Sequence, residues 1–152
     1  MTFFIKCDIN KETFWNHFEV QIFQKEEALK QKILLVDDDT GVSDIFVAIF
    51  DSGAFPGYEI VVQKKFEEGM GFALDHKGDF CAVLLDGQIE AGQGWQIAEA
   101  LRLAGYQGII FSVAGRALCD AVPANKRWAF NGWFQKPVPI RELIGKLQDE
   151  WL

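Results

Sequence analysis

Three short apolar segments constrain the fold of this chain more than any other feature of its sequence. They occupy residues 32–37, 80–86 and 108–114, and the first two end in aspartate. Runs of this length are too short for ordinary helices, but they suit strands that are buried on both faces of a parallel sheet. Two weaker strands are expected at Tyr58–Gln63 and Gly132–Gln135.

Amphipathic segments separate these strands. Apolar residues recur at helical spacing in Asp44–Phe50, Phe66–Leu74, Gly94–Leu103 and Ile140–Trp151. Thr40 or Ser43 is expected to cap the first of these helices. Strand and helix therefore alternate five times, which predicts an α/β fold with a doubly wound, five-stranded parallel sheet.

The first 31 residues precede this unit, so we expect two parts, an N-terminal extension at 1–31 and a domain at 32–152. Residues 3–5 suggest a short strand, and a helix is expected from Asn10. Phe14, Phe18 and Ile22 would form an apolar stripe on that helix. The stripe either packs on the chain's own domain or forms a dimer or partner interface, and the sequence leaves both open.

Charge and hydropathy exclude several classes of partner. The formal net charge of −7 argues against non-specific nucleic-acid binding, which needs a basic surface. The apolar runs are far too short to span a bilayer, and the N-terminus lacks the features of a signal peptide. We therefore expect a cytoplasmic protein without nucleic-acid or membrane partners.

Acidic residues follow two of the predicted strands at their carboxyl ends. Asp37, Asp38 and Asp39 follow the first strand, and Asp86 ends the strand at 80–86. Ligands of open α/β sheets bind beyond these ends, where converging carboxylates would repel one another and favour a hard cation such as Mg²⁺. A central carboxylate could then accept a phosphoryl group, with Lys136 completing the site. The alternative is that these acids merely cap helices.

These acids and Lys136 follow strands of an α/β pattern, and on this basis the chain from Lys32 to Leu152 resembles the receiver domain of two-component response regulators. The resemblance implies the flavodoxin-like receiver fold. No single motif is specific, but the ordered set is. It comprises Lys32–Asp39, Val83–Asp86, Gly94, Arg102, Trp133 and Gln135–Pro137.

The resemblance implies a role for each site residue. Asp37 and Asp38 would be the acidic pair that binds Mg²⁺, and Asp86 would be both phosphoacceptor and metal ligand. Gln88 would offer its backbone carbonyl to the metal, and Lys136 would pair with the phosphoryl group. The family also implies a cis bond before Pro137, with a histidine kinase or histidine phosphotransfer protein as the phosphodonor.

The sequence departs from the family pattern at several positions. The family has Thr or Ser at the end of its fourth strand, where this chain has Val113 preceded by Ser112. A small slip at the strand end would bring Ser112 into the site, and we expect Ser112, Val113 and Trp133 to form the switch positions. Glu90 replaces a common proline, and the stretch 116–131 has weak helical periodicity.

These observations leave three functions. The first is a stand-alone phosphoacceptor receiver that signals by contact with a downstream protein partner or as a homodimer, and that is not an enzyme. The second is a receiver-like interaction module without regulated phosphorylation. The third, more remote, is a haloacid-dehalogenase-like phosphatase, for which Asp37, Asp39 and Gly41 match the motif only in part.

Overall fold

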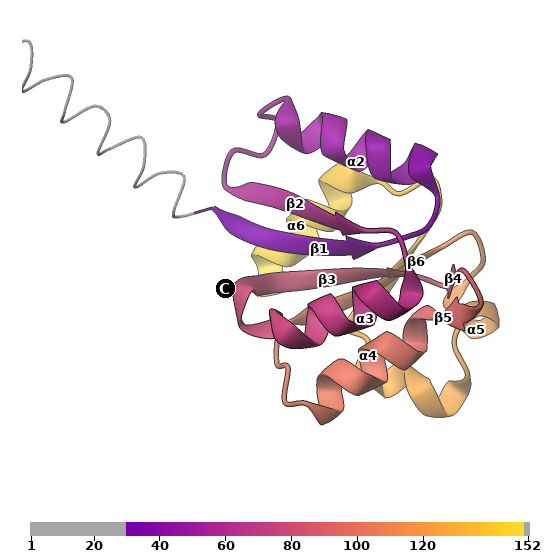
Figure 1. Ribbon diagram of the computed structural model, residues 1–152. Coiled ribbons are helices and arrows are strands. Elements are labelled where there is room, and N and C mark those ends of the chain that lie inside the picture. The colour runs from indigo at the N-terminus through magenta and orange to yellow at the C-terminus, as the bar shows by residue number, and fades with distance from the viewer. Residues whose placement is uncertain (1–29, 151–152) are drawn as a thin grey trace, which may run out of the picture. The chain divides into compact units, whose positions relative to one another are not determined.

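The computed structural model describes residues 30–150. The strand expected at 3–5, the helix expected from Asn10 and nearly all of the 1–31 extension lie outside this range. Figure 1 shows a sheet between helices. In chain order the elements are β1 (Gln31–Val36), α2 (Thr40–Asp51), β2 (Tyr58–Gln63), α3 (Phe66–Asp75), the 3₁₀ helix η1 (Lys77–Asp79), β3 (Phe80–Asp86), β4 (Gln88–Ile89), β5 (Gly92–Gln93), α4 (Gly94–Leu103), β6 (Ile109–Ala114), α5 (Leu118–Ala121), the 3₁₀ helix η2 (Ala124–Ala129), β7 (Gly132–Gln135) and α6 (Ile140–Glu150).

The main sheet has five strands in the order β2-β1-β3-β6-β7, and every neighbouring pair is parallel. This confirms the predicted doubly wound α/β fold. The chain leaves β1 toward β2 on one side and later enters β3 on the other, so the strand order reverses between β1 and β3. The carboxyl ends of these two strands are where a doubly wound sheet binds its ligands.

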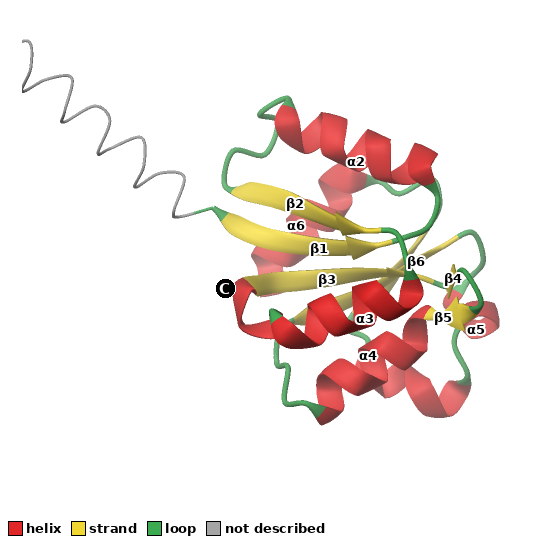
Figure 2. Cartoon of the chain, in the orientation of Figure 1, coloured by secondary structure: helices red, strands yellow, loops and turns green. Residues whose placement is uncertain are grey.

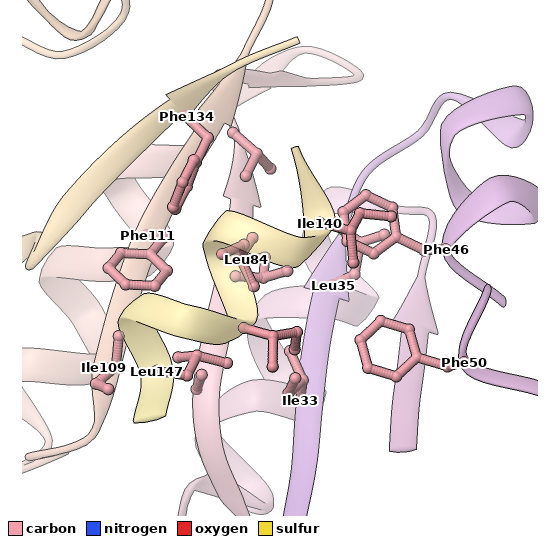
Figure 3. Packing of buried hydrophobic residues seen from close by; sticks show 14 residues of the cluster. Ile33, Leu35, Phe46, Phe50, Leu84, Ile109, Phe111, Phe134, Ile140 and Leu147 are labelled. Atoms are coloured by element: carbon pink, nitrogen blue, oxygen red, sulfur yellow. The ribbon is translucent and has the colours of Figure 1, made fainter. Parts of the chain in front are cut away.

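Helices cover both faces of the sheet, as Figure 2 shows in red. Helices α2 and α6 pack on one face, and α3 and α4 pack on the other. Figure 3 shows the first core, in which Ile33 and Leu35 of β1 meet Phe46 and Phe50 of α2. The intervening Leu34 faces the second core, with α3 and α4. The central strands β1, β3 and β6 are therefore continuous apolar runs, because helices cover both of their faces.

The segment after β6 is irregular, as its weak periodicity predicted. It contains only the short α5 and the 3₁₀ helix η2 before β7 begins. Arg102 anchors its end, because its guanidinium donates to the carbonyls of Ala129, Tyr106 and Gly108 at 2.8–3.0 Å. The same group donates to Asn131 Oδ1 at 2.7 Å.

The start of α2 differs from the sequence-based expectation. The N-cap is Asp39, whose Oδ1 accepts from the Val42 amide at 3.2 Å, rather than Thr40 or Ser43. Ser43 instead donates its hydroxyl to the Asp39 carbonyl at 3.0 Å. One of the three consecutive acids therefore does cap a helix, which leaves Asp37 and Asp38 for other contacts. Among residues 30–150, no helix is long and apolar enough to cross a membrane.

Candidate functional site

Strand register brings the predicted acids together. Val36 pairs with Leu85 across β1 and β3, so the next residues, Asp37 and Asp86, lie side by side and on the same face. Asp38 follows in the loop. One carboxylate oxygen from each of these three residues lies within 4.8 Å of the other two. Carboxylate oxygens are the ligands that hard cations such as Mg²⁺ and Ca²⁺ prefer.

Lys136 reaches this cluster from the end of β7, two strands away from β3. Its backbone amide donates to the Ala114 carbonyl at 2.8 Å, which extends the β6–β7 pairing to the lysine. Its Nζ lies 2.8 Å from Asp37 Oδ2 and 3.1 Å from Asp86 Oδ1. The Lys136–Pro137 peptide bond is cis, as the resemblance implied. The structure therefore gathers Asp37, Asp38, Asp86 and Lys136 into one site.

The electrostatics of the site are those of a crowded, partly dry pocket. Burial raises the pKa of Asp86 to about 6, and the neighbouring Asp37 adds to this, while Lys136 acts in the opposite direction. Burial lowers the pKa of Lys136, but its contacts with Asp37 and Asp86 outweigh burial and the net direction is upward. Lys136 is thus a permanent cation that partly offsets the repulsion between two carboxylates.

The residues present suit a divalent cation. Asp37 is fully buried, and its Oδ2 accepts no well-directed hydrogen bond despite the nearby Lys136 ammonium. Asp37 Oδ1 accepts from the Asp39 amide at 2.9 Å, which fixes the orientation of the carboxylate. The side chain of Asp86 is 13 % exposed, so a small ligand can reach it. Gln88 begins β4, two residues after Asp86.

The register excludes the slip that would have brought Ser112 into the site. Val113 pairs with Asp86, and Ser112 pairs with Leu85. Successive side chains point to opposite faces of a sheet, so Ser112 faces away from Asp86 and the expectation for Ser112 was wrong. The fully buried Val113 stands where a hydroxyl would be expected, so the site lacks that donor. Trp133 lies on the edge strand β7 and is 55 % exposed.

Gly94 is required by a close approach to the end of β3. A Cβ at this position would lie 2.1 Å from the Asp86 carbonyl oxygen. The Gly94 amide donates to the Gly87 carbonyl at 3.1 Å, which holds the start of α4 against the end of β3. The glycine that the resemblance singled out by spacing alone therefore has a steric reason.

Sequence reasoning missed the role of Glu90. Its amide donates to Asp38 Oδ2 at 2.8 Å, and its Oε1 accepts from the Phe66 amide at 2.7 Å. Its φ is 54°, a conformation that proline, fixed near −65°, cannot adopt, so the backbone here is incompatible with the family's proline. The only sequence feature that singled out Glu90 was the absence of the family's proline, and that absence did not predict the two hydrogen bonds.

A second concave region lies at the opposite, amino-terminal edge of the sheet. This cavity of about 600 Å³ is bordered by the starts of β3 and β6, including Cys81, Tyr106 and Ile109. Burial raises the pKa of the Cys81 thiol to about 11, so it is protonated and unreactive at neutral pH. Burial also raises the pKa of Tyr106. The clustered carboxylates and Lys136 lie at the other edge, at the carboxyl ends of the strands.

Comparison with solved structures identifies the fold. A receiver domain protein from Methanospirillum hungatei superposes with a TM-score of 0.62 at 24% identity, covering 80% of this chain and 93% of that one. One from Methylobacillus flagellatus gives a TM-score of 0.65 at 17% identity, covering 79% and 98%. The fold is that of a receiver domain. No family model matches the sequence, and no curated protein matches it.

A third similar structure shows receiver chemistry in another protein. A response regulator from Burkholderia pseudomallei contains a phosphorylated aspartic acid and a calcium ion. It has a TM-score of 0.65 and 15% identity, and the match covers 78% of this chain and 66% of that one. At these identities the three comparisons show a shared receiver fold.

Proposed function

We propose that this chain is a phosphoacceptor receiver domain in which Asp86 takes up a phosphoryl group. The observation that carries the proposal is the convergence of Asp37, Asp38 and Asp86 with Lys136, whose Nζ lies 3.1 Å from Asp86 Oδ1. The receiver fold and the phosphorylated aspartate of the Burkholderia pseudomallei protein support it. Its action would be to carry a signal, not to turn over a substrate.

The reaction follows from the residues at the strand ends. An Asp86 carboxylate oxygen attacks phosphorus, an acyl phosphate bond forms, and the bond from phosphorus to the donor atom breaks with its electron pair leaving on the donor. The donor is a small phosphodonor or a phosphohistidine of a histidine kinase or histidine phosphotransfer protein. Lys136 pairs with the charge on the transferred group. Water later hydrolyses the acyl phosphate and restores the carboxylate.

Mg²⁺ is the cofactor that we propose for this site. Asp37, Asp38 and Asp86 would hold it with their carboxylates, and Gln88 would add its backbone carbonyl. When bound, the cation neutralises charge on the phosphoryl oxygens and on the acidic cluster. Lys136 is already present as a fixed positive charge, so it is available to balance the phosphoryl group.

Phosphorylation would act by shifting the balance between two conformations that a partner distinguishes. We expect this partner to be a protein, or a second copy of the chain, in contact with the surface that includes Trp133. A cytoplasmic location and a stand-alone role stay predictions from the sequence.

The second candidate is a receiver-like interaction module without regulated phosphorylation. Two observations favour it, namely Val113 in the position expected for a hydroxyl and the replacement of a regular helix by α5 and η2. In that case the fold would present a constant surface to its partner. A phosphatase of the haloacid dehalogenase type would instead release phosphate from an ester continuously, and we expect no such turnover.

Intact-mass spectrometry separates these functions. The protein is incubated with acetyl phosphate or phosphoramidate, with Mg²⁺ or with a chelator. We expect the mass to rise by one phosphoryl group only when Mg²⁺ is present, and Asp86→Ala to abolish the rise. If the wild-type mass does not change while an ordinary receiver is modified in parallel, the interaction module is the better description.

A further inference from the structure

Glu90 adopts a backbone conformation that its residue type disfavours. It is the only non-glycine residue between positions 30 and 150 with a positive φ, at 54°. It lies in the turn between β4 and β5, where Gln88 pairs with Gln93 and Ile89 with Gly92. Glycine is the usual residue at such a position. A strained residue that persists beside a functional site is a reason to look for a role.

The two hydrogen bonds of Glu90 connect the acidic site with a helix. The Glu90 amide donates to Asp38 Oδ2, and the Glu90 carboxylate accepts from the amide of Phe66, the first residue of α3. Lys65, the N-cap of α3, makes no capping bond with its side chain. The Glu90 carboxylate, 24 residues further along the chain, therefore caps α3. Its negative charge also lies at the positive end of the helix dipole.

Phe66 is held to the same turn by its ring. A Cβ on Gly92 would come within 2.2 Å of the Phe66 ring, so the ring lies directly against the glycine backbone. Ile89, at the other strand of the turn, is fully buried in the core beneath α3 and α4. The turn is thus anchored to the core, and its tip contacts both Asp38 and the start of α3.

We propose that Glu90 is a positioning residue for the cation site, acting through Asp38 and not on the phosphoryl group itself. This inference rests on the proposed function, because it concerns the Mg²⁺ that the three acids would bind. Asp38 is the exposed member of the three, so its carboxylate is the one most free to rotate. A charged hydrogen-bond acceptor held at 2.8 Å by a backbone amide loses much of that freedom.

The same contacts predict coupling between the cation and α3. If Glu90 holds Asp38 in the orientation that favours Mg²⁺, bound Mg²⁺ must in turn stabilise the Glu90 turn and its bond to Phe66. Mg²⁺ is therefore expected to slow hydrogen exchange at the Phe66 amide. The site would transmit its occupancy to the start of α3 before any phosphoryl transfer.

Three substitutions of Glu90 separate its contributions, with Mg²⁺ affinity measured by calorimetry on the whole chain. Glu90→Gln keeps an acceptor for Phe66 and should bind Mg²⁺ within about twofold of the wild type. Glu90→Gly keeps the backbone turn but loses the carboxylate, and affinity should fall by about threefold. Glu90→Pro cannot adopt φ 54° and loses the amide that Asp38 accepts from, and affinity should fall by about tenfold or more.

Glu67→Gln is the matched control, because Glu67 is an exposed acid in the first turn of the same helix. It should leave Mg²⁺ affinity unchanged. A double-mutant cycle tests whether the effect passes through Asp38. Glu90→Gly should have no further effect on Mg²⁺ affinity once Asp38→Ala has removed the side chain that accepts from the Glu90 amide. Thermal unfolding without Mg²⁺ identifies variants that have lost the fold.

The outcomes are distinct from those of the phosphorylation experiment. Wild-type affinity in both Glu90→Gly and Glu90→Pro, with the fold intact, would overturn the role of Glu90 even if Asp86 is phosphorylated. An equal loss on Glu90→Gly in the Asp38→Ala background would show a role that does not pass through Asp38, which also overturns it. Absence of Mg²⁺ binding by the wild type would remove both this inference and the proposed cofactor, whereas Mg²⁺ binding without phosphorylation would leave the inference standing.

Discussion

Lys136 Nζ lies 3.1 Å from Asp86 Oδ1, although Asp86 ends β3, Lys136 follows β7, and β6 lies between these two strands. The same ammonium is 2.8 Å from Asp37 Oδ2. It therefore occupies part of the space in which a cation would be attracted by these acids. The lysine stabilises the metal-free site and competes with a bound metal, and this double role has a measurable consequence.

Replacing Lys136 by methionine should separate metal binding from phosphorylation. Lys136→Met removes the competing charge with a side chain of similar length, so Mg²⁺ should bind roughly tenfold more tightly, equivalent to about 1.4 kcal/mol. The yield of phosphorylated Asp86 from acetyl phosphate should fall, because the transferred group loses its partner. Calorimetry and intact-mass spectrometry measure the two effects. Weaker Mg²⁺ binding in this variant would show that Lys136 does not compete with Mg²⁺ for the acids.

The raised pKa of Asp86 predicts how stability depends on pH. Asp86 titrates at about 6 in the folded protein and near 4 when unfolded, so the folded state holds the proton more tightly between these values. Its contribution to stability is therefore present below pH 4 and is lost as pH rises through 6. Asp86→Asn should stabilise the metal-free protein by about 2 kcal/mol at pH 8 and by little at pH 4.

Chemical unfolding at the two pH values, with a chelator present, measures this difference. Asp75→Asn is a suitable control, because Asp75 is an exposed acid at the end of α3, just before the chain enters the start of β3. An equal effect of Asp86→Asn at both pH values would show that burial and Asp37 do not perturb this carboxyl. In the wild type, Mg²⁺ affinity should also fall as pH drops below 6, since a proton then competes for Asp86.

Much of this site could be predicted because it depends on strand ends. Asp37 and Asp86 each follow a buried run, and two parallel neighbours must bring such residues to one edge of the sheet. Lys136 was predictable for the same reason. Gly94 was identified by its spacing from Asp86, although only the structure shows the carbonyl oxygen that excludes a side chain.

Other features depend on information that the sequence does not carry. The choice between Ser112 and Val113 turns on a register of one residue, and one residue reverses the face of the sheet. Glu90 contacts Asp38 and Phe66, which are far from it in the chain, so no local pattern indicated the contacts. Asp39 was grouped with the site acids by adjacency, whereas its side chain caps α2.

A hydroxyl introduced at position 113 tests whether Val113, and not Ser112, occupies the position that faces Asp86. Val113→Thr is nearly isosteric and faces Asp86, so it should strengthen binding of beryllofluoride, a mimic of the phosphoryl group, by roughly tenfold. It should also destabilise the free protein by about 1–2 kcal/mol, because the new hydroxyl is buried. Tryptophan fluorescence and thermal unfolding measure these effects. Ser112→Ala, on the opposite face, should leave beryllofluoride binding unchanged, and a loss there would restore Ser112 to the site.

The close approach at Gly94 predicts a large effect from one methyl group. In Gly94→Ala the new Cβ would meet the Asp86 carbonyl, which belongs to the backbone and cannot rotate away, so stability should fall by about 3 kcal/mol. Gly71, inside α3, has open space around it, and Gly71→Ala should stabilise by about 0.5 kcal/mol. Urea unfolding of both variants checks the pair. Equal stability of Gly94→Ala and wild type would refute the steric argument.

Asp86 itself should carry the phosphoryl group, and locating the modification in the chain distinguishes Asp86 from the other aspartates. After reaction with acetyl phosphate and Mg²⁺, borohydride reduction converts an aspartyl phosphate into a stable homoserine that tandem mass spectrometry can place in the chain. We predict homoserine at position 86 in the wild type and none in the presence of a chelator. Modification at any other aspartate, or none in a protein that binds Mg²⁺, would contradict the assignment of Asp86.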